Sequence, residues 1–296
     1  MPKNKKEKKD DVNSLVSKIN KKYGNGSCFY GKHNEFKEKI DIIPTPLNAL
    51  NMALGVGGFT KGRTIELMGV EGGGKTALSL QTIGLLQKNG GRASFIDAEH
   101  ALNLKLAKVL GVDTDSLLIT TPGTGEEALD ILEMQVRSGL FDLIVVDSVA
   151  ALTPQKEIDG EMGDTFVALQ ARMMSQAMRK LNAAVSKTNT CVIFINQLRD
   201  DIGKMFGDKT TSPGGKALKY YSSVRINIKH IGKICKTVKD KRVCIGHKLK
   251  ALVVKNKLAP NYTEAEFNFL YNKGLEDLKD VEVKPEIKTK EVDEFE

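Results

Sequence analysis

The stretch Gly69-Val70-Glu71-Gly72-Gly73-Gly74-Lys75-Thr76 decides the fold of this 296-residue chain. It fits G-x-x-x-x-G-K-[ST], the phosphate-binding loop that joins a strand to a helix. Its glycines let backbone N–H groups turn toward phosphate oxygens, and the helix that follows adds its dipole. We expect Gly69 to Ala77 to bind a nucleoside triphosphate, with Lys75 on the β- and γ-phosphates and Thr76 on Mg²⁺. A glycine-rich turn without a ligand is the alternative, and the predicted strand and helix on either side argue against it.

Around this loop, apolar runs of strand length alternate with helical patterns. This alternation is typical of the α/β class, in which helices cover both faces of a mostly parallel sheet. We predict strands at residues 64–68, 93–97, 117–120, 143–147 and 191–196, and helices at 76–88, 102–110, 126–138 and 167–187. After residue 223 only strands are expected, at 224–231, 249–254 and 265–270, with residues 232–246 as a hairpin excursion. This last block would extend the sheet with antiparallel strands.

The two ends of the chain differ from this core, which we place at residues 36–275. Residues 1–35 combine a predicted amphipathic helix with a short apolar segment, Cys28–Tyr30, which we expect to be a strand. Since a lone helix and strand cannot bury both faces, this arm is expected to pack on the core or on a neighbouring subunit. Residues 276–296 carry nine acids and four lysines, and we expect them to form a solvated, disordered acidic tail.

The composition is that of a globular protein, with 41% hydrophobic residues and a net charge of +8. The charge is compatible with a nucleic-acid partner, although a lysine-rich composition also arises from an AT-rich genome. No run of about 18 apolar residues occurs, so no membrane span is expected. The four cysteines are scattered, which indicates reduced thiols in a cytoplasmic protein. For Cys235, Cys244 and His247 we favour ordinary hairpin thiols over a zinc site, because zinc prefers two close pairs of ligands.

Candidate catalytic residues lie at the ends of two predicted strands. Asp147 ends one of them and is expected to hold Mg²⁺ together with Thr76. Glu99 lies just after another, on the edge of the sheet where ligands bind. It is our candidate for the base that activates water. Asp97 and His100, its neighbours in sequence, are interpreted as structural residues.

Gln197 follows a third strand and is a candidate sensor, since its amide can bond the γ-phosphate and lose that bond after hydrolysis. An ordinary polar strand cap is the alternative. The segment 198–215 comes next, long and rich in Gly, Lys and Thr. Long loops inside compact domains are usually functional, so we expect the nucleotide to govern the order of this one. A second loop, residues 157–164, follows the Asp147 strand. Two such loops on one edge are expected to clamp a polymer.

Six sequence blocks together resemble the bacterial RecA recombinases, and the likeness runs from about residue 11 to 275. The blocks are GVEGGGKT (69–76), FIDAEHAL (95–102), VVDSVAALTP (145–154), ARMMSQAMRKL (171–181), FINQLR (194–199) and VVKNK (253–257). Several are long and unlike the sequences of generic P-loop proteins. The resemblance implies a RecA-type core and an N-terminal arm that docks on the next protomer. It also implies a right-handed filament on single-stranded DNA, with ATP between subunits.

The resemblance implies further roles that the residues alone do not show. Lys255 and Lys257 match a basic pair that reaches the neighbour's ATP. Asn103, Leu106 and Tyr271 match positions near the nucleotide. Because Leu106 stands where the family has a stacking tyrosine, base recognition is expected to be looser. The matches to DNA-binding positions are Val167, Arg172, Arg179, Arg199, Ile202, Gly214, Gly215 and Lys216.

We therefore predict a DNA-dependent ATPase that uses ATP and Mg²⁺, forms filaments on single-stranded DNA, pairs it with duplex DNA and exchanges strands. The family's C-terminal domain has no counterpart after residue 275, so we expect the step that admits duplex DNA to differ. Two alternatives stay open: another RecA-core ATPase, such as a helicase or ring-type motor, and an ATP-binding accessory protein acting on DNA. The loop blocks argue against the first, and the intact Lys75, Glu99 and Asp147 argue against the second.

Overall fold

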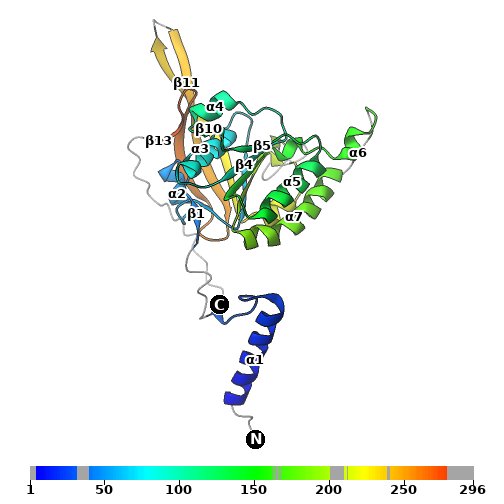
Figure 1. Ribbon diagram of the computed structural model, residues 1–296. Helices are drawn as coiled ribbons and strands as arrows, with labels where there is room; N and C mark the ends of the chain where they lie inside the picture. The colour runs from blue at the N-terminus through cyan, green and yellow to red at the C-terminus, as the bar shows by residue number, and fades with distance from the viewer. Residues whose placement is uncertain are drawn as a thin grey trace, which may run out of the picture. The chain divides into compact units, whose positions relative to one another are not determined.

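The computed structural model describes residues 5–31, 40–162, 164, 166, 168–200, 210–211, 213–238 and 241–278 (Figure 1). The chain divides into two compact units, Met1–Asp41 and Ile42–Glu296. Within the described ranges, no helix is long and apolar enough to cross a membrane.

The smaller unit contains the helix α1 (Lys5–Tyr23), as predicted for the arm. After the helix, Asn20 ties the chain back on itself. Its side-chain amide donates to the carbonyl oxygen of Cys28 at 2.9 Å, and its Oδ1 accepts the N–H of Cys28 at 2.9 Å. The segment Cys28–Tyr30 is not a strand, contrary to our prediction. Asn20 occupies both backbone groups of Cys28 that a strand ladder would use.

A nine-stranded sheet forms the centre of the larger unit, in the order β13-β12-β11-β10-β3-β7-β6-β4-β5. The six strands from β10 to β5 are parallel, and β11, β12 and β13 are added antiparallel at one side. Their bounds are β3 (Thr64–Gly69), β4 (Ala93–Asp97), β5 (Leu118–Thr120), β6 (Leu143–Asp147), β7 (Cys191–Gln197), β10 (Val224–Val238), β11 (Lys241–Asn256), β12 (Thr263–Leu270) and β13 (Gly274–Asp277). The mostly parallel sheet that the sequence predicts is confirmed.

Helices cover both faces of this sheet (Figure 1). The main ones are α3 (Lys75–Lys88), α4 (Leu104–Val109), α5 (Gly125–Ser138) and α7 (Leu169–Thr188). Helices α3 and α4 pack on Val145 and Ile193 in one hydrophobic cluster. Helices α5 and α7 pack on Ile144 and Val192 in the other. Because successive strand residues point to opposite faces, the parallel strands are buried on both sides. Their carboxyl ends meet at one edge, which we call the carboxyl edge.

Short elements surround this frame. They are β1 (Ile42–Ile43), α2 (Asn48–Ala53), β2 (Phe59–Thr60), the 3-10 turn Val149–Ala151, α6 (Gln155–Ile158), β8 (Arg199–Asp200), β9 (Thr210–Thr211) and α8 (Ala217–Tyr221). Strand β13 runs to Asp277, two residues past the boundary that the sequence suggested. Asp277 accepts the N–H groups of Asn48 at 2.8 Å and Ala49 at 3.1 Å, which belong to the first turn of α2. This carboxylate therefore caps a helix.

Strands β10 and β11 form a longer hairpin than the sequence suggests. They span 15 and 16 residues, and the hairpin excursion predicted at residues 232–246 is confirmed as a continuation of the two strands. The hairpin projects beyond the rest of the sheet at the top of Figure 1. Alternation of apolar residues is weak there, because both faces of a two-stranded projection are open to water.

Candidate functional site

The predicted phosphate loop connects β3 to α3, as its motif requires. Gly69 has a φ of 155°, and a Cβ added there would lie 2.3 Å from the carbonyl oxygen of Ile228. Gly74 is left-handed with a φ of 77°, and an added Cβ would lie 2.9 Å from Leu249 Cδ1. Glycine is needed at both positions, because a side chain would clash and, at Gly74, strain the backbone. The loop thus packs on β10 and β11 and ends at a helix N-terminus, where phosphate binds well.

Lys75 lies over this loop. Its Nζ donates to the carbonyl oxygens of Gly69 at 3.1 Å and Val70 at 2.7 Å. Burial lowers the pKa of Lys75, while nearby carboxylates, first Asp147 and then Glu99, act in the opposite direction. Phosphate oxygens that enter the loop would therefore meet a buried cation whose present partners are only backbone carbonyls and more distant acids.

Thr76 and Asp147 meet beside the loop. The Oγ1 of Thr76 donates to Asp147 Oδ2 at 2.7 Å, and Asp147 is 7% exposed. Burial raises the pKa of Asp147 to about 6; the charge of Glu99 adds to the rise, whereas the Thr76 hydrogen bond opposes it. A hydroxyl and a carboxylate are hard oxygen ligands of the kind that Mg²⁺ takes. These two residues therefore fit the ion that the sequence predicts.

Glu99 receives hydrogen bonds from two neighbouring strands. The Oε1 of Glu99 accepts the hydroxyl of Ser148, which directly follows β6, and the Nε2 of Gln197 at 3.0 Å, which ends β7. The sequence reading missed Ser148, although its position next to Asp147 places it at the same edge. Two donors on one oxygen orient the carboxylate and leave its other oxygen for water.

The two residues beside Glu99 were interpreted as structural. Asp97 accepts the backbone N–H groups of Ala101 at 3.2 Å and Leu102 at 2.9 Å, and so shapes the turn after β4. This reading of Asp97 is confirmed. His100 has a positive φ of 54° in the same turn. Asp97 and His100 therefore help to place Glu99 at the carboxyl edge.

Gln170, which the sequence reading missed, joins the segments that follow β6 and β7. Its Nε2 donates to the carbonyl oxygens of Val149 at 2.8 Å and Leu152 at 3.1 Å, and its Oε1 accepts the N–H of Gly214 at 3.0 Å. Gly214 and Gly215 both have positive φ, and a Cβ at Gly214 would lie 2.8 Å from Val149. The close backbone approach explains the two glycines.

A buried ion pair fixes the same region to the sheet. Glu66 is fully buried and accepts Arg225 Nε at 2.5 Å. Its other oxygen accepts Asn196 Nδ2 at 2.9 Å, and that amide also donates to the carbonyl oxygen of Pro213 at 3.2 Å. Asn196 directly precedes Gln197. The end of the long predicted loop is thus held to the strand that carries the predicted sensor.

Lys255 and Lys257 lie far from the phosphate loop, toward the amino ends of the parallel strands. Arg225 on β10 lies between Lys255 on β11 and Glu66 on β3, so Lys255 is level with Glu66 and two strands away from it. Gly69 lies three residues further along β3, level with Ile228. Lys255 is therefore displaced from Gly69 by roughly 10 Å along the strands and roughly 10 Å across them. Its Nζ donates to the carbonyl oxygens that end α8, and burial, with Lys257 next, lowers its pKa to about 8. The pair does not reach the phosphate loop of its own chain.

The residues predicted to flank a base lie near α3. Asn103 caps α4, with its Oδ1 accepting the N–H of Leu106 at 3.0 Å, and Leu106 packs against the core. At the turn that follows Tyr271, a Cβ on Gly274 would lie 2.4 Å from Leu110 of the same α4 region. Leu106 and Leu110 are four residues apart and share a helix face. The geometry thus brings the Tyr271 turn and the Leu106 helix together.

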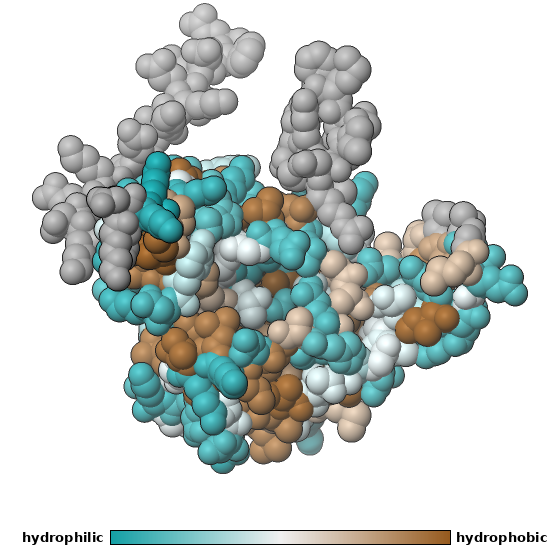
Figure 2. All heavy atoms as spheres, turned by 90° about the horizontal axis from the view of Figure 1, so that it is seen from above, coloured by the Kyte–Doolittle hydropathy of each residue, from teal (hydrophilic) through white to brown (hydrophobic). Residues whose placement is uncertain are grey.

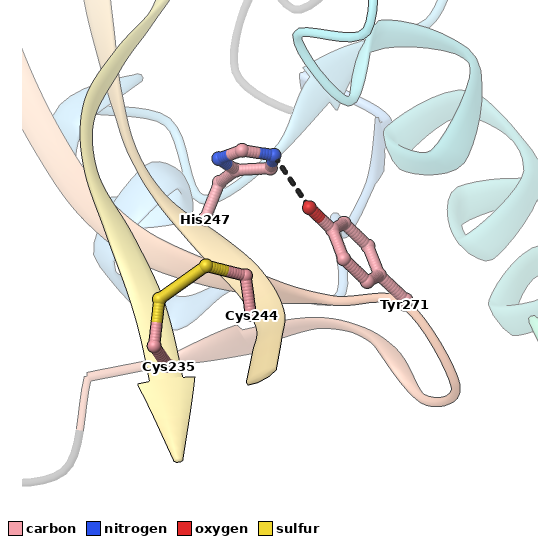
Figure 3. Close-up of a disulfide and its surroundings, with 4 residues drawn as sticks. All are labelled: Cys235, Cys244, His247 and Tyr271. Atoms are coloured by element: carbon pink, nitrogen blue, oxygen red, sulfur yellow. Dashed lines mark hydrogen bonds between the residues drawn. A yellow bond between two sulfur atoms is a disulfide. The ribbon is translucent and has the colours of Figure 1, made fainter. Parts of the chain in front are cut away.

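The hairpin cysteines are paired, which corrects the expectation of reduced thiols. Cys235 and Cys244 form a disulfide between directly opposed strand positions, with their Cα atoms 3.9 Å apart. Sequence spacing could not reveal this, because irregular register between His230 and Cys235 decides which residues face each other. His247, three residues after Cys244, bonds Tyr271 through its Nε2 at 2.8 Å (Figure 3). Burial, with His230 next, lowers the pKa of His247.

Apart from Gly214 and Gly215, the residues predicted to bind DNA fall into three groups. Arg172 and Arg179 are exposed on α7, and Lys216 is exposed before α8. Arg199 lies in β8, where only the backbone is described. Val167 and Ile202 lie outside the described residues. Figure 2 looks down from the side on which the hairpin projects, and that face mixes hydrophilic and hydrophobic residues.

Comparisons with known proteins agree with this geometry. The family model described as the RecA N-terminal domain matches residues 10–276. Proteins named Protein RecA from Francisella tularensis subsp. novicida (strain U112) and subsp. tularensis (strain WY96-3418) are each 50% identical over 268 residues, covering 90% of this chain and 74% of the relative. The crystal structure of the RadB recombinase matches with a TM-score of 0.57, 22% identity, and coverage of 79% of this chain and 98% of that chain. This last likeness supports the fold alone.

Proposed function

Since the chain belongs to the RecA family, we propose that it is a cytoplasmic recombinase that hydrolyses ATP with Mg²⁺ while assembled on single-stranded DNA. In this role it pairs that strand with duplex DNA during recombination, repair and the response to DNA damage. The observation that carries the proposal is the Glu99 carboxylate, held by Ser148 and Gln197 beside a phosphate loop.

The phosphates would be held by the backbone N–H groups of Gly69 to Thr76 and by Lys75. Thr76 and Asp147 would ligate Mg²⁺, which neutralises charge on the phosphate oxygens when bound. Leu106 and Tyr271 would flank the base. Lys75 gains a stronger partner than its present carbonyl oxygens, because a phosphate oxygen carries a negative charge that attracts the ammonium.

Glu99 would orient the attacking water and accept its proton. The carboxylate is already positioned by Ser148, so little reorganisation is needed at the moment of reaction. Gln197 now donates to Glu99; in the bound state its amide would turn to the γ-phosphate. That turn would release one donor from Glu99 and so raise its basicity.

The movement of Gln197 would be transmitted to the predicted DNA-binding segment, residues 198–215. Asn196, its neighbour, is bonded to Glu66 and to Pro213 at the end of that segment. A shift of the strand end would therefore alter how the segment 198–215 is held. Arg172, Arg179, Arg199 and Lys216 would contact the DNA phosphates, with Val167 and Ile202 between bases and Gly214 and Gly215 allowing close approach.

Lys255 and Lys257 would complete the site of a neighbouring protomer. They lie too far from their own phosphate loop, and burial, followed by the charge of Lys257, lowers the pKa of Lys255 to about 8. Two cations held close together are costly without an anion, and a neighbour's phosphates would supply one. Head-to-tail contacts of this kind produce filaments when they do not close into a ring.

The alternatives are less well supported. The family match extends through the arm and both loop blocks, from residue 10 to 276, which does not favour a helicase or ring-type motor. An accessory protein that binds ATP without hydrolysing it would not need the Glu99 arrangement.

The direct test is the rate of ATP hydrolysis by the purified chain, with and without single-stranded DNA, in Mg²⁺. We expect hydrolysis to rise at least tenfold with DNA, an increase equivalent to about 1.4 kcal/mol of activation energy. Filaments should be visible by electron microscopy under the same conditions, and DNA binding should weaken as salt rises, because phosphate contacts release counterions. Rings without DNA-dependent filaments would instead favour a motor.

A further inference from the structure

The end of the β10–β11 hairpin has little support from the rest of the sheet. Beyond Ile228, β10 no longer pairs with β3, and before Gly246, β11 no longer pairs with β12. Among the described residues, the ribbon formed by residues 235–238 and 241–245 is therefore paired mainly within itself (Figure 1). A two-stranded ribbon alone is only marginally stable in water.

The disulfide lies where this support ends. Cys244 lies two residues before Gly246, where the pairing of β11 with β12 begins. Cys235 is the direct cross-strand partner of Cys244. The bond thus closes the ribbon at its base. Cys244 is exposed and lines a surface cavity of about 640 Å³ together with Lys236, Tyr271 and Lys273. A small thiol can reach the bond from this side.

Tyr271 is tied to the same part of β11 twice. Its backbone N–H donates to the carbonyl oxygen of Ile245 at 3.0 Å. Its hydroxyl bonds His247 Nε2 at 2.8 Å, with the two rings edge to face at 5.5 Å between centroids (Figure 3). Both partners lie within three residues of Cys244. Tyr271 is 49% exposed, and its ring also lies edge to face with Phe269 at 6.1 Å between centroids.

We propose that His247 is a positioning residue for Tyr271, and that the Cys235–Cys244 disulfide holds Ile245, the second residue tied to Tyr271. Intact, the bond keeps β11 regular through Ile245, and Tyr271 stays against the space beside α4. Broken, it lets the ribbon fray toward Gly246, which loosens the Ile245 tie, while His247 stays paired with Lys233 and Phe269. The inference deepens the proposed function, since it rests on Tyr271 flanking the base of ATP.

The chemical step is thiol–disulfide exchange with a dithiol reductant. One reductant thiolate attacks a sulfur of the Cys235–Cys244 bond, forms a mixed disulfide and releases the other cysteine as a thiol after protonation. The second reductant thiol then displaces the remaining cysteine. The reductant loses two electrons and two protons and becomes a disulfide. Cys235 and Cys244 each gain one electron and one proton. A small-molecule disulfide reverses the reaction.

The first experiment varies His247 in the oxidised full-length chain. His247→Ala should raise the KM for ATP about fivefold, the factor that corresponds to one ordinary hydrogen bond, with kcat nearly unchanged. His247→Gln keeps a polar group at the Nε2 position and should restore most of the affinity. If His247 had a merely structural role, His247→Ala would instead lower both kcat and the free energy of unfolding. His247→Gln would then restore neither. Equal KM values for all three proteins would overturn the positioning role.

The second experiment changes the redox state. Thiol counting in denaturant, which exposes the buried Cys191, should find two free cysteines in the oxidised protein, Cys28 and Cys191, and four after dithiothreitol. Reduction should raise the Kd and the KM for ATP by about the same factor as His247→Ala, since each removes one of the two hydrogen bonds that tie Tyr271 to β11. The Cys235→Ser/Cys244→Ser pair should match the reduced protein and ignore dithiothreitol, which excludes effects through the other two thiols.

The outcomes separate this inference from the proposed function. A protein whose ATP affinity depends on redox state but that hydrolyses nothing would refute the ATPase and support the disulfide's role. A DNA-dependent ATPase with the same KM in both states would refute the disulfide's role alone. A protein that binds no ATP in either state would overturn both.

Discussion

Glu99→Gln is expected to lower the kcat of ATP hydrolysis by about 10²–10⁴-fold, the usual contribution of a general base. Glutamine keeps the shape of the side chain, and its carbonyl oxygen can still accept the hydroxyl of Ser148. It cannot accept a proton from water. ATP binding should therefore persist, and filaments on single-stranded DNA should form and last longer, because turnover no longer ends the ATP-bound state.

The measurement is single-turnover ATP hydrolysis with saturating single-stranded DNA, alongside equilibrium ATP binding. Glu133→Gln is a matched control, since Glu133 pairs with Arg137 and Lys180 on α5 and α7, away from the carboxyl edge. It should keep the wild-type kcat. If Glu99→Gln hydrolysed ATP within a few fold of the wild-type rate, Glu99 would not be the base.

Asp147→Asn is expected to abolish Mg²⁺-dependent hydrolysis and yet to stabilise the protein in the absence of nucleotide and Mg²⁺. The pKa of Asp147 rises from 3.8 in the unfolded chain to about 6 in the fold, mainly through burial. The folded state therefore binds this proton more tightly than the unfolded state. Below about pH 4 the carboxyl is protonated in both states, so folding loses nothing to its charge. Stability falls as pH rises from about 4 to about 6, because the unfolded state ionises first, and above that the buried charge opposes folding by roughly 1–3 kcal/mol.

Urea unfolding at several pH values tests this expectation. Without Mg²⁺, Asp147→Asn should be more stable than wild type by roughly 1–3 kcal/mol at pH 8, and the difference should vanish near pH 4. The amide oxygen still accepts the Thr76 hydrogen bond, so that contact does not confound the comparison. A variant less stable than wild type at pH 8, or one that keeps Mg²⁺-dependent hydrolysis, would contradict the role given to Asp147.

Local patterns were enough to predict the frame of the molecule and the residues at its carboxyl edge. A phosphate loop, apolar runs and acids at strand ends are continuous in sequence, and they placed Lys75, Asp147, Glu99 and Gln197. Parallel strands bring their carboxyl ends to one edge whatever their order. Residues on different strands could therefore be grouped before the strand order was known.

The residues that the sequence reading missed depend on which segments are neighbours in space. Ser148 and Gln170 matter because β4, β6 and β7 lie side by side and because Gly214 returns to α7. Asp277 was assigned to an acidic tail. Its role as the cap of α2 could not be predicted, because Ala49, one of the residues whose N–H it accepts, lies 228 positions away in the sequence. The pairing of Cys235 with Cys244 depends on hairpin register, which three irregularities shift.

Subunit mixing tests the central claim most directly, namely that ATP is hydrolysed at sites that two protomers share on DNA. Lys75→Ala removes the phosphate contact in its own loop, and Lys255→Ala/Lys257→Ala removes the pair offered to a neighbour. Each variant alone should be inactive with single-stranded DNA. An equal mixture should regain activity, up to about a quarter of wild type, because about a quarter of random head-to-tail interfaces join two intact halves. A Lys255→Ala/Lys257→Ala protein that is fully active alone, or a mixture that stays inactive at every ratio, would contradict the account.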